Sequence, residues 1–193
     1  MAGIPKRGRG YAQGDASSGQ RSEEAPPAAA QEAAGRSSAR VCVTIAYVGI
    51  GSNLDDPRSH VLKAFEELER LPHTRLVRKS SLYRSAPVGH AAQPDFVNAV
   101  ARLETGLPAE RLLAELQEIE ARHGRRRSFP NAPRTLDLDI LLYGDLMLRT
   151  PDLEIPHPRM HQRSFVLKPL LEISPELAGR FEVCPGQKIE RID

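Results

Sequence analysis

Two aspartates separated by one residue form the pattern in this chain that most clearly suggests chemistry. The run Arg134-Thr-Leu-Asp-Leu-Asp-Ile140 is typical of a strand, on which alternate side chains share a face, so Asp137 and Asp139 lie roughly 6–7 Å apart. Adjacent carboxylates repel each other unless positive charge lies between them. Mg²⁺ meets this need because it prefers oxygen ligands and bridges carboxylates and phosphates. The pair predicts a magnesium site, although a bare pair also fits an ordinary solvated strand face.

Basic residues precede the aspartates in the chain. Arg122-His-Gly-Arg-Arg-Arg127 is followed by a loop with two prolines, residues 128–133, and then by Arg134. Guanidinium groups bind phosphate oxygens through paired hydrogen bonds, so this loop beside two carboxylates suits a polyphosphate–metal complex. The arginine run also fits a solvated helix end, where basic side chains complement the helix dipole.

A second set of residues suits a flat heterocycle. The segment 85–89 (Ser-Ala-Pro-Val-Gly) can offer backbone N–H and C=O groups to a ligand edge. Phe96 and Asn98 share a strand face, which places an aromatic plane beside an amide that donates and accepts hydrogen bonds. On their own, these two residues also fit an ordinary packed aromatic with a satisfied amide.

Three further polar residues are candidates for ligand contact. His157 lies between prolines in Ile155-Pro-His-Pro158, a rigid loop able to hold a ligand-positioning group, although a lone histidine is also a common structural residue. Gln117 and Glu120 lie three residues apart beside the apolar stripe of a predicted helix, where they face either a ligand or solvent.

The apolar patterns predict the elements that position these residues. Strands are expected at 41–50, 76–84, 96–104 and 136–143, and helices at 57–70, at 107–124 with Pro108 in the first position, and at 165–171. On the last strand we expect Leu136, Leu138, Ile140 and Leu142 to face the core together. The core order β-α-β-β-α-β is that of a ferredoxin-like α+β fold, an antiparallel sheet with helices packed on one face. That fold serves binding modules and enzymes alike.

Composition separates a tail from one domain. Residues 1–40 are rich in Ala, Gly, Ser, Pro and charge, so we expect a disordered tail with at most a short Ala-rich helix, followed by a domain at 41–193. The net charge of +2 does not call for nucleic acid, and no apolar run approaches the ~20 residues of a membrane helix. Two cysteines without metal-site spacing indicate free thiols. We expect a cytoplasmic monomer with no nucleic-acid or membrane partner.

Several motifs, taken together in order and spacing, resemble an enzyme family. They are Tyr47-Val-Gly-Ile-Gly-Ser-Asn-Leu54, Tyr83-Arg-Ser-Ala-Pro87, Gln93-Pro-Asp-Phe-Val-Asn98, Pro133-Arg-Thr-Leu-Asp-Leu-Asp-Ile140, and Ile155-Pro-His157 through Phe165. The family is 6-hydroxymethyl-7,8-dihydropterin pyrophosphokinase, and the resemblance runs from about Val43 to beyond Ile173. It implies transfer of pyrophosphate from ATP to the pterin hydroxymethyl oxygen, with release of AMP, in folate biosynthesis.

The resemblance also implies a set of site residues. Two Mg²⁺ ions would be held by Asp137 and Asp139, which with Arg125 and Arg134 form the implied catalytic group. The implied ATP-binding residues are Gln117, Glu120, Arg125, Arg127, Arg134, Ile140, His157 and Arg163. The implied pterin-binding residues are Ser85, Ala86, Pro87, Val88, Phe96, Asn98 and Phe165, with the ring between the two phenylalanines.

The chain departs from some family members at three places. Phe96 and Pro158 stand where some members have tyrosine, and the loop 128–132 lacks a tryptophan found in some relatives. Two other classes of protein remain as alternatives: an RNA-binding module of the same β-α-β-β-α-β order, and a regulatory small-molecule-binding domain without catalysis.

Overall fold

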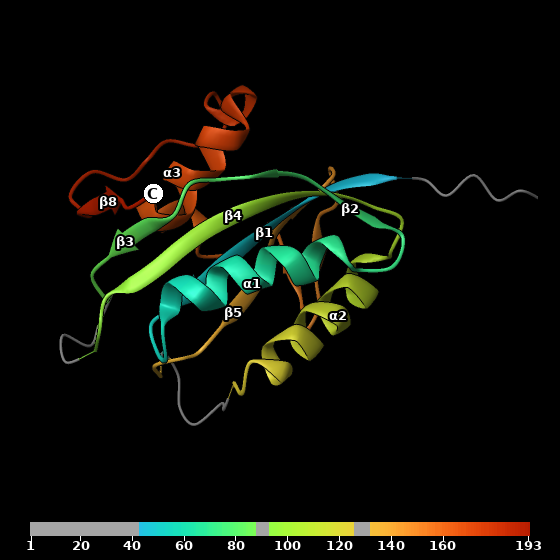
Figure 1. Ribbon diagram of the computed structural model, residues 1–193. Coiled ribbons are helices and arrows are strands. Elements are labelled where there is room, and N and C mark those ends of the chain that lie inside the picture. The colour runs from blue at the N-terminus through green and yellow to red at the C-terminus, as the bar shows by residue number, and fades with distance from the viewer. Residues whose placement is uncertain (1–42, 88–92, 126–131) are drawn as a thin grey trace, which may run out of the picture. The chain divides into compact units, whose positions relative to one another are not determined.

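A six-stranded sheet forms the centre of the computed structural model, which describes residues 43–87, 93–125 and 132–193 (Figure 1). The predicted disordered tail lies outside the described residues, as do Val88 and Arg127 of the implied site. The strands are β1 (Thr44–Ser52), β2 (Thr74–Lys79), β3 (Tyr83–Ser85), β4 (Phe96–Thr105), β5 (Asp137–Tyr143) and β8 (Ile189–Arg191). Their order is β5-β1-β4-β3-β8, with β2 also paired to β4, and every pair is antiparallel. The β5-β1-β4-β2 part is the strand order of the predicted ferredoxin-like core.

Helices α1 (Pro57–Glu69) and α2 (Ala109–Arg122) cover one face of the sheet, as predicted (Figure 1). Asp56 begins α1 because its side chain accepts the Ser59 N–H at 3.3 Å, and Pro57 then occupies the first helical position. Pro108 lies just before α2 as its N-cap residue instead of in the predicted first position. The buried side chains of both helices pack on alternate residues of β1, β4 and β5 to form a first core.

Helix α3 (Ser164–Ile173) covers the opposite face of the sheet, which the sequence analysis left unassigned. Its buried residues Val166, Leu167 and Leu170 pack on Tyr47 and Val100 in a second core. Short elements lead into and out of it: β6 (Leu148–Arg149) and β7 (Glu154–Ile155) form a two-stranded sheet, η1 (Met160–Gln162) precedes α3, and η2 (Pro175–Leu177) follows it. The start of α3 is thereby placed over the strand face that carries the aspartates.

A β-bulge in β5 corrects one prediction. Val48 pairs with Ile140 but Tyr47 pairs with Leu142, so Leu141 is an extra residue in the ladder. Leu136, Leu138 and Ile140 face the first core as predicted, whereas Leu142 turns to the second core together with Leu141. The prediction for Leu142 was wrong because strict alternation of side chains fails across a bulge.

The single strand predicted at 76–84 is two strands. Ser80 interrupts it: its N–H donates to the Val100 carbonyl at 2.9 Å, and its hydroxyl accepts the Val100 N–H at 2.9 Å. The Ser81 N–H then donates to the carboxylate of Glu172 at 3.1 Å, and the Leu82 N–H donates to the carboxylate of Asp193 at 3.0 Å. Side chains distant in the sequence thus replace the ladder at the break. In the described ranges, no helix has the length and apolarity needed to cross a membrane.

Candidate active site

A cavity of about 350 Å³ opens on the sheet face that carries the aspartates. Its walls come from β1, β4 and β5, from the segments that follow β3 and β7, from the start of α3 and from the C-terminal segment. Most of the predicted site residues line it: Ser85, Ala86, Pro87, Phe96, Asn98, Arg125, Arg134, Asp137, Asp139, His157, Arg163 and Phe165. The structure therefore brings together residues that the sequence placed more than 70 positions apart.

Glycines lie opposite both aspartates. Gly49 pairs with Asp139 and Gly51 pairs with Asp137 in the β1–β5 ladder. Because directly paired residues project on the same face, neither aspartate meets a side chain across the ladder. A Cβ added at Gly51 would lie 3.6 Å from Asn98 Oδ1 and 4.0 Å from the Asp137 Cβ. Gly51 therefore leaves space beside Asp137, whereas the Leu141 side chain packs on Gly49, 3.2 Å from where a Cβ would lie.

That space and the type of donor fit a hard divalent cation. Asp137 and Asp139 offer carboxylate oxygens from one strand face, which are the ligands that Mg²⁺ prefers. Among the residues that the structure describes, no group of three or more His, Cys, Asp or Glu side chains could hold a metal by itself. A cation here would complete its shell with water or substrate oxygens, as Mg²⁺ commonly does.

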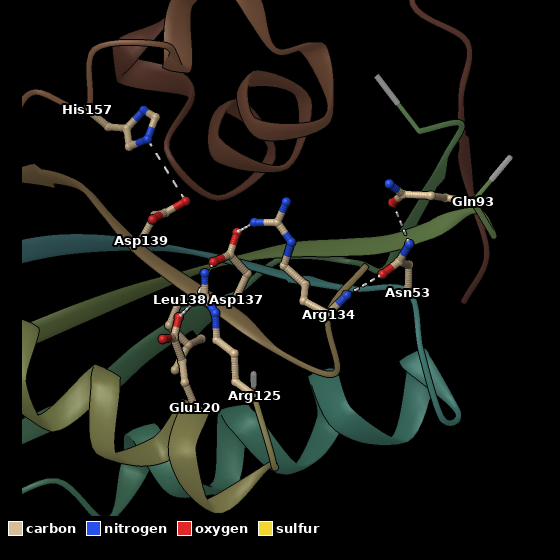
Figure 2. Close-up of polar contacts among 9 residues, drawn as sticks. All are labelled: Asn53, Gln93, Glu120, Arg125, Arg134, Asp137, Leu138, Asp139 and His157. Carbon is tan, nitrogen blue, oxygen red and sulfur yellow. Dashed lines mark hydrogen bonds and ion pairs between the residues drawn. The ribbon is translucent and has the colours of Figure 1, made fainter. Parts of the chain in front are cut away.

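Asp137 is held by two arginines (Figure 2). Its Oδ1 lies 2.6 Å from Arg125 Nη1, and its Oδ2 lies 2.5 Å from Arg134 Nη1. All three side chains are mostly buried, with 16–21% of each exposed, so these are strong charge-assisted contacts. The two arginines therefore neutralise this carboxylate.

Glu120 stabilises the contact between Arg125 and Asp137. Its Oε1 contacts Arg125 Nη1 and accepts the backbone N–H of Leu138 at 2.7 Å, and the residue is only 3% exposed. Figure 2 shows the side chain reaching from α2 toward β5. Glu120, predicted to bind ATP, is thus placed behind Arg125 and outside the cavity lining.

Asp139 lies close to the other aspartate and to a histidine. Desolvation in the cavity wall raises the pKa of Asp139 to about 6, the negative charge of Asp137 adds to that rise, and Arg163 opposes it. His157 Nε2 lies 3.9 Å from Asp139 Oδ2. Burial, and then the charges of Arg163 and Arg159, lower the pKa of His157 to about 4, so its imidazole is neutral near pH 7.

The backbone holds His157 in a defined orientation. Its N–H donates to the carbonyl of the bulge residue Leu141 at 2.9 Å. Its ring Nδ1 accepts the Arg159 N–H at 3.2 Å. A neutral ring that accepts at Nδ1 carries its hydrogen on Nε2, the atom that faces Asp139. The bulge that overturned the prediction for Leu142 therefore also positions this histidine.

The other half of the cavity carries the two phenylalanines. The Arg134 guanidinium lies 5.8 Å from the Phe96 ring centre, and the Arg163 guanidinium lies 5.7 Å from the Phe165 ring centre. Asn98 is 5% exposed, and its amide donates to Ser85 Oγ at 3.0 Å. Cation–π contacts thus link the residues assigned to phosphate with those assigned to the pterin.

Two assigned residues lie away from this cavity. Gln117 is exposed on α2, and the Ile140 side chain is 3% exposed within the first core. Neither is among the lining residues, so their predicted contact with ATP stays a prediction.

The structure adds lining residues that the sequence analysis did not assign: Gly49, Gly51, Gln93, Arg159, Gln162 and Gln187. The two glycines could have been found from the sequence, because they lie two residues apart at the end of a predicted strand. Glycine inside a strand often marks a place where a ligand or another backbone approaches closely. Gln187 carried no such signal, because nothing local marks a glutamine 48 residues after Asp139 as a residue of the same cavity.

Comparisons with known proteins agree with this geometry. Residues 47–175 match the model of a protein family described as 7,8-dihydro-6-hydroxymethylpterin-pyrophosphokinase. A Pseudomonas aeruginosa relative named 2-amino-4-hydroxy-6-hydroxymethyldihydropteridine pyrophosphokinase is 49% identical over 154 residues, which cover 76% of this chain and 95% of the relative. A Haemophilus influenzae relative of the same name is 48% identical over 144 residues, covering 75% and 87%. These matches favour the enzyme over the RNA-binding and regulatory alternatives.

Solved structures show the same fold. Wild-type Plasmodium falciparum HPPK-DHPS with SDX-DHP is similar with a TM-score of 0.53 at 13% identity, covering 67% of this chain and 40% of that one. An HPPK-DHPS in complex with substrates gives a TM-score of 0.55 at 14% identity, covering 69% and 40%. This chain spans about two-fifths of those longer chains, and at such identities the likeness is one of fold. It confirms the predicted α+β architecture.

Proposed function

The chain belongs to the 7,8-dihydro-6-hydroxymethylpterin-pyrophosphokinase family, and we propose that its cavity holds ATP, Mg²⁺ and the pterin together during the transfer. The activity is that of a pyrophosphokinase of folate biosynthesis. The observation that carries the proposal is the Asp137 and Asp139 pair in the cavity wall, with Gly51 opposite Asp137 and with Arg125 and Arg134 both on the Asp137 carboxylate.

The arginines change partner when the nucleotide binds. Arg125 and Arg134 are committed to Asp137 without ligand, and a triphosphate offers them more negative charge with matching oxygen geometry. Arg134 Nε is buried without a hydrogen-bond partner in the described part of the chain, and a phosphate oxygen would satisfy this donor once the side chain moves away from Asp137. Release of the guanidinium groups then frees the Asp137 oxygens.

Asp137 and Asp139 hold two Mg²⁺ ions in this proposal, and the residues around them have separate tasks. When bound, Mg²⁺ neutralises phosphate oxygens and stabilises charge that develops on the attacking and leaving oxygens. Arg163, which lines the cavity over Phe165, binds the remaining phosphate charge. His157 is a neutral group with its Nε2 hydrogen toward Asp139, so it lines the phosphate site without adding positive charge.

The pterin lies in the half of the cavity between Phe96 and Phe165. Aromatic faces bind a fused ring by stacking, and Asn98 together with the backbone of 85–87 meets its polar edge. This arrangement directs the hydroxymethyl oxygen toward the phosphate half. Attack on the β-phosphorus is then in line and direct, with AMP as the leaving group.

No covalent enzyme intermediate is part of this mechanism. The described cysteine, Cys184, is not among the lining residues, and within the described residues the hydroxyl of the lining Ser85 accepts from the Asn98 amide, which is not a base. Positioning of two substrates and neutralisation of phosphate charge supply the rate enhancement.

The decisive experiment mixes the purified protein with ATP and 6-hydroxymethyl-7,8-dihydropterin and follows AMP. We expect one AMP and one pterin diphosphate per ATP consumed, and no turnover when EDTA removes divalent cations. Turnover that persists in EDTA would reject the metal assignment, and absence of AMP with Mg²⁺ present would reject the activity for this chain.

We also propose that the enzyme acts as a cytoplasmic monomer. The described walls of the cavity come from residues of one chain, which supports a monomer. Cys184 is a free thiol, which suits a reducing compartment. Light scattering at micromolar concentration should give the mass of one chain, 21.3 kDa. A dimer mass, or AMP release that rises steeply with protein concentration, would contradict this.

A further inference from the structure

The C-terminal segment touches both walls of the pterin half of the cavity. At one end, β8 pairs with β3, so Ile189 lies opposite Ser85. At the other end, the residues before β8 contact the start of α3, which carries Phe165. We propose that residues 181–191, called here the C-terminal strap, set the spacing of these walls, and that Gln187 is a positioning residue for the pterin. This rests on the proposed function of the cavity.

Gln187 makes a two-ended contact with the start of α3. Its Oε1 accepts the Ser164 N–H at 2.9 Å, and its Nε2 donates to the Gln162 carbonyl at 2.9 Å. Ser164 is the first residue of α3, and Arg163 before it provides no side-chain cap. The first N–H groups of a helix lack partners within the helix. Gln187 therefore caps α3 from 23 residues away in the sequence.

Other contacts anchor the strap independently of Gln187. Ser164 Oγ donates to the Cys184 carbonyl at 2.7 Å, and the Phe181 ring, 4% exposed, lies 5.3 Å from the His161 ring. Gly186 has a φ of 91°, a left-handed conformation that turns the strap back toward β3 and that other residues adopt at a cost. Replacement of Gln187 should therefore loosen the start of α3 while the strap stays in place.

The two residues that flank Ser164 are the ones that face the ligands. Arg163 and Phe165 both line the cavity, and Ser164 between them is completely buried. A helix start without its cap samples other backbone angles, which turn Phe165 away from the pterin plane. Gln187 thus acts on the pterin through Phe165. It lies beyond the segment 47–175 that matches the family model.

The test compares Gln187→Leu with Gln187→Glu. Leucine removes both hydrogen bonds, whereas glutamate keeps an acceptor for the Ser164 N–H and replaces the donor to the Gln162 carbonyl by an oxygen. We expect Gln187→Leu to raise the KM for the pterin by about fivefold or more, as loss of one helix cap would. The kcat should change less than the KM, and Gln187→Glu should recover most of the pterin affinity. Val183→Thr, an isosteric change at a half-exposed site in the same strap, is the control.

Amide hydrogen exchange provides a readout that does not need turnover. In Gln187→Leu, the Ser164 amide should exchange faster while amides of β1 and β4 keep their protection. If Gln187→Leu fails to fold, Gln187→Asn, whose side chain is one methylene too short to span both partners, should show the same pattern.

Two outcomes overturn the inference. One is that the pterin KM and the exchange rate of the Ser164 amide are unchanged in both Gln187→Leu and Gln187→Asn. The other is an equal rise of the ATP and pterin KM with faster exchange throughout the sheet, which would indicate general destabilisation. Failure of the proposed function is distinct, since the wild-type protein would then release no AMP at all.

Discussion

Asn53 and Arg134 bind each other through two backbone-directed hydrogen bonds that join the end of β1 to the residue that enters β5. The Arg134 N–H donates to Asn53 Oδ1 at 2.8 Å, and the Asn53 N–H donates to the Arg134 carbonyl at 3.1 Å. The Asn53 amide also donates to Gln93 Oε1 and to the Pro94 carbonyl, both at 3.3 Å (Figure 2 shows the first of these). Asn53 thus ties the phosphate half of the cavity to the segment that leads into Phe96.

Asn53→Ala should weaken the binding of both substrates and also lower the stability of the fold. Asn53 is 1% exposed, so its removal leaves the Arg134 N–H and the Pro94 carbonyl without partners and lowers the free energy of unfolding by roughly 2–3 kcal/mol. The KM for ATP and for the pterin should both rise. Asn53→Asp is the matched control, because it keeps the acceptor for Arg134 and should lose only part of the stability in urea unfolding. A rise in only one of the two KM values would contradict the link between the halves.

Asp139→Ala should lower kcat at least about a hundredfold, because it deletes a carboxylate proposed to hold the metal. The fold should survive, since Asp139 contributes its side chain to the cavity and not to either core. Asp139→Asn, which keeps the size and removes the charge, separates charge from shape. Nucleotide titrations with and without Mg²⁺ check the cause, and near-normal turnover in either variant would exclude the metal role.

Glu120→Ala should lower stability more than Glu120→Gln. Alanine leaves the buried Leu138 N–H unsatisfied and deprives Arg125 of one partner, at a cost of roughly 3 kcal/mol. Glutamine keeps a carbonyl acceptor for Leu138, so the two variants should separate in thermal unfolding. Glu120→Ala should also lower kcat, because the Arg125 side chain is then held by Asp137 alone, whereas glutamine keeps a neutral acceptor for Arg125 and should lower kcat less. Equal melting temperatures for the wild type and both variants would show that Glu120 has no supporting role.

Phe165→Ala should mainly weaken the binding of the pterin. The side chain lines the cavity and stacks under Arg163, so its loss removes one aromatic face, worth roughly 1–3 kcal/mol, from the ring site. Phe165→Tyr keeps the aromatic plane and is the control. Fluorescence titration measures pterin affinity, and equal affinity in Phe165→Ala and the wild type would count against the proposed ring site.

The stability of the fold should fall at alkaline pH through Tyr83. Burial raises the pKa of Tyr83 to about 12, and its hydrogen bond to Glu172 at 2.9 Å adds to the rise. A raised pKa means that the folded state holds the proton more tightly. The contribution of protonated Tyr83 to the free energy of unfolding is therefore complete below pH 10, the ordinary pKa of tyrosine. It is lost as the pH rises to about 12, the pKa in the folded state.

Tyr83→Phe isolates that effect. The variant should lack the part of the pH dependence between 10 and 12, worth at most roughly 2–3 kcal/mol, while the other titrating groups remain. Urea unfolding of both proteins at pH 8 and pH 11 measures the difference. Parallel stability curves for the two proteins would show that Tyr83 titrates as an ordinary exposed tyrosine.

Most of the fold followed from local patterns. The alternation of Asp137 and Asp139 with Leu136 and Leu138 predicted both the strand and its two faces, and the helix patterns predicted α1, α2 and α3 closely. The predicted strand at 76–84 was wrong at Ser80, because the break depends on partners in Val100, Glu172 and Asp193. Those partners are distant in sequence and leave no periodic signal in the strand itself.

The sequence alone determined the order of the elements, the carboxylate pair, the aromatic residues that we propose for the ring site, and the family. These are properties of residue type and spacing, and backbone geometry converts spacing directly into faces. Only the tertiary structure decided that the glycines of β1 oppose the aspartates, that Arg125 and Arg134 share Asp137, and that Gln187 caps α3. The physical reason is that strand register, ion pairing and capping from a distance depend on which surfaces meet, and sequence spacing constrains that only weakly.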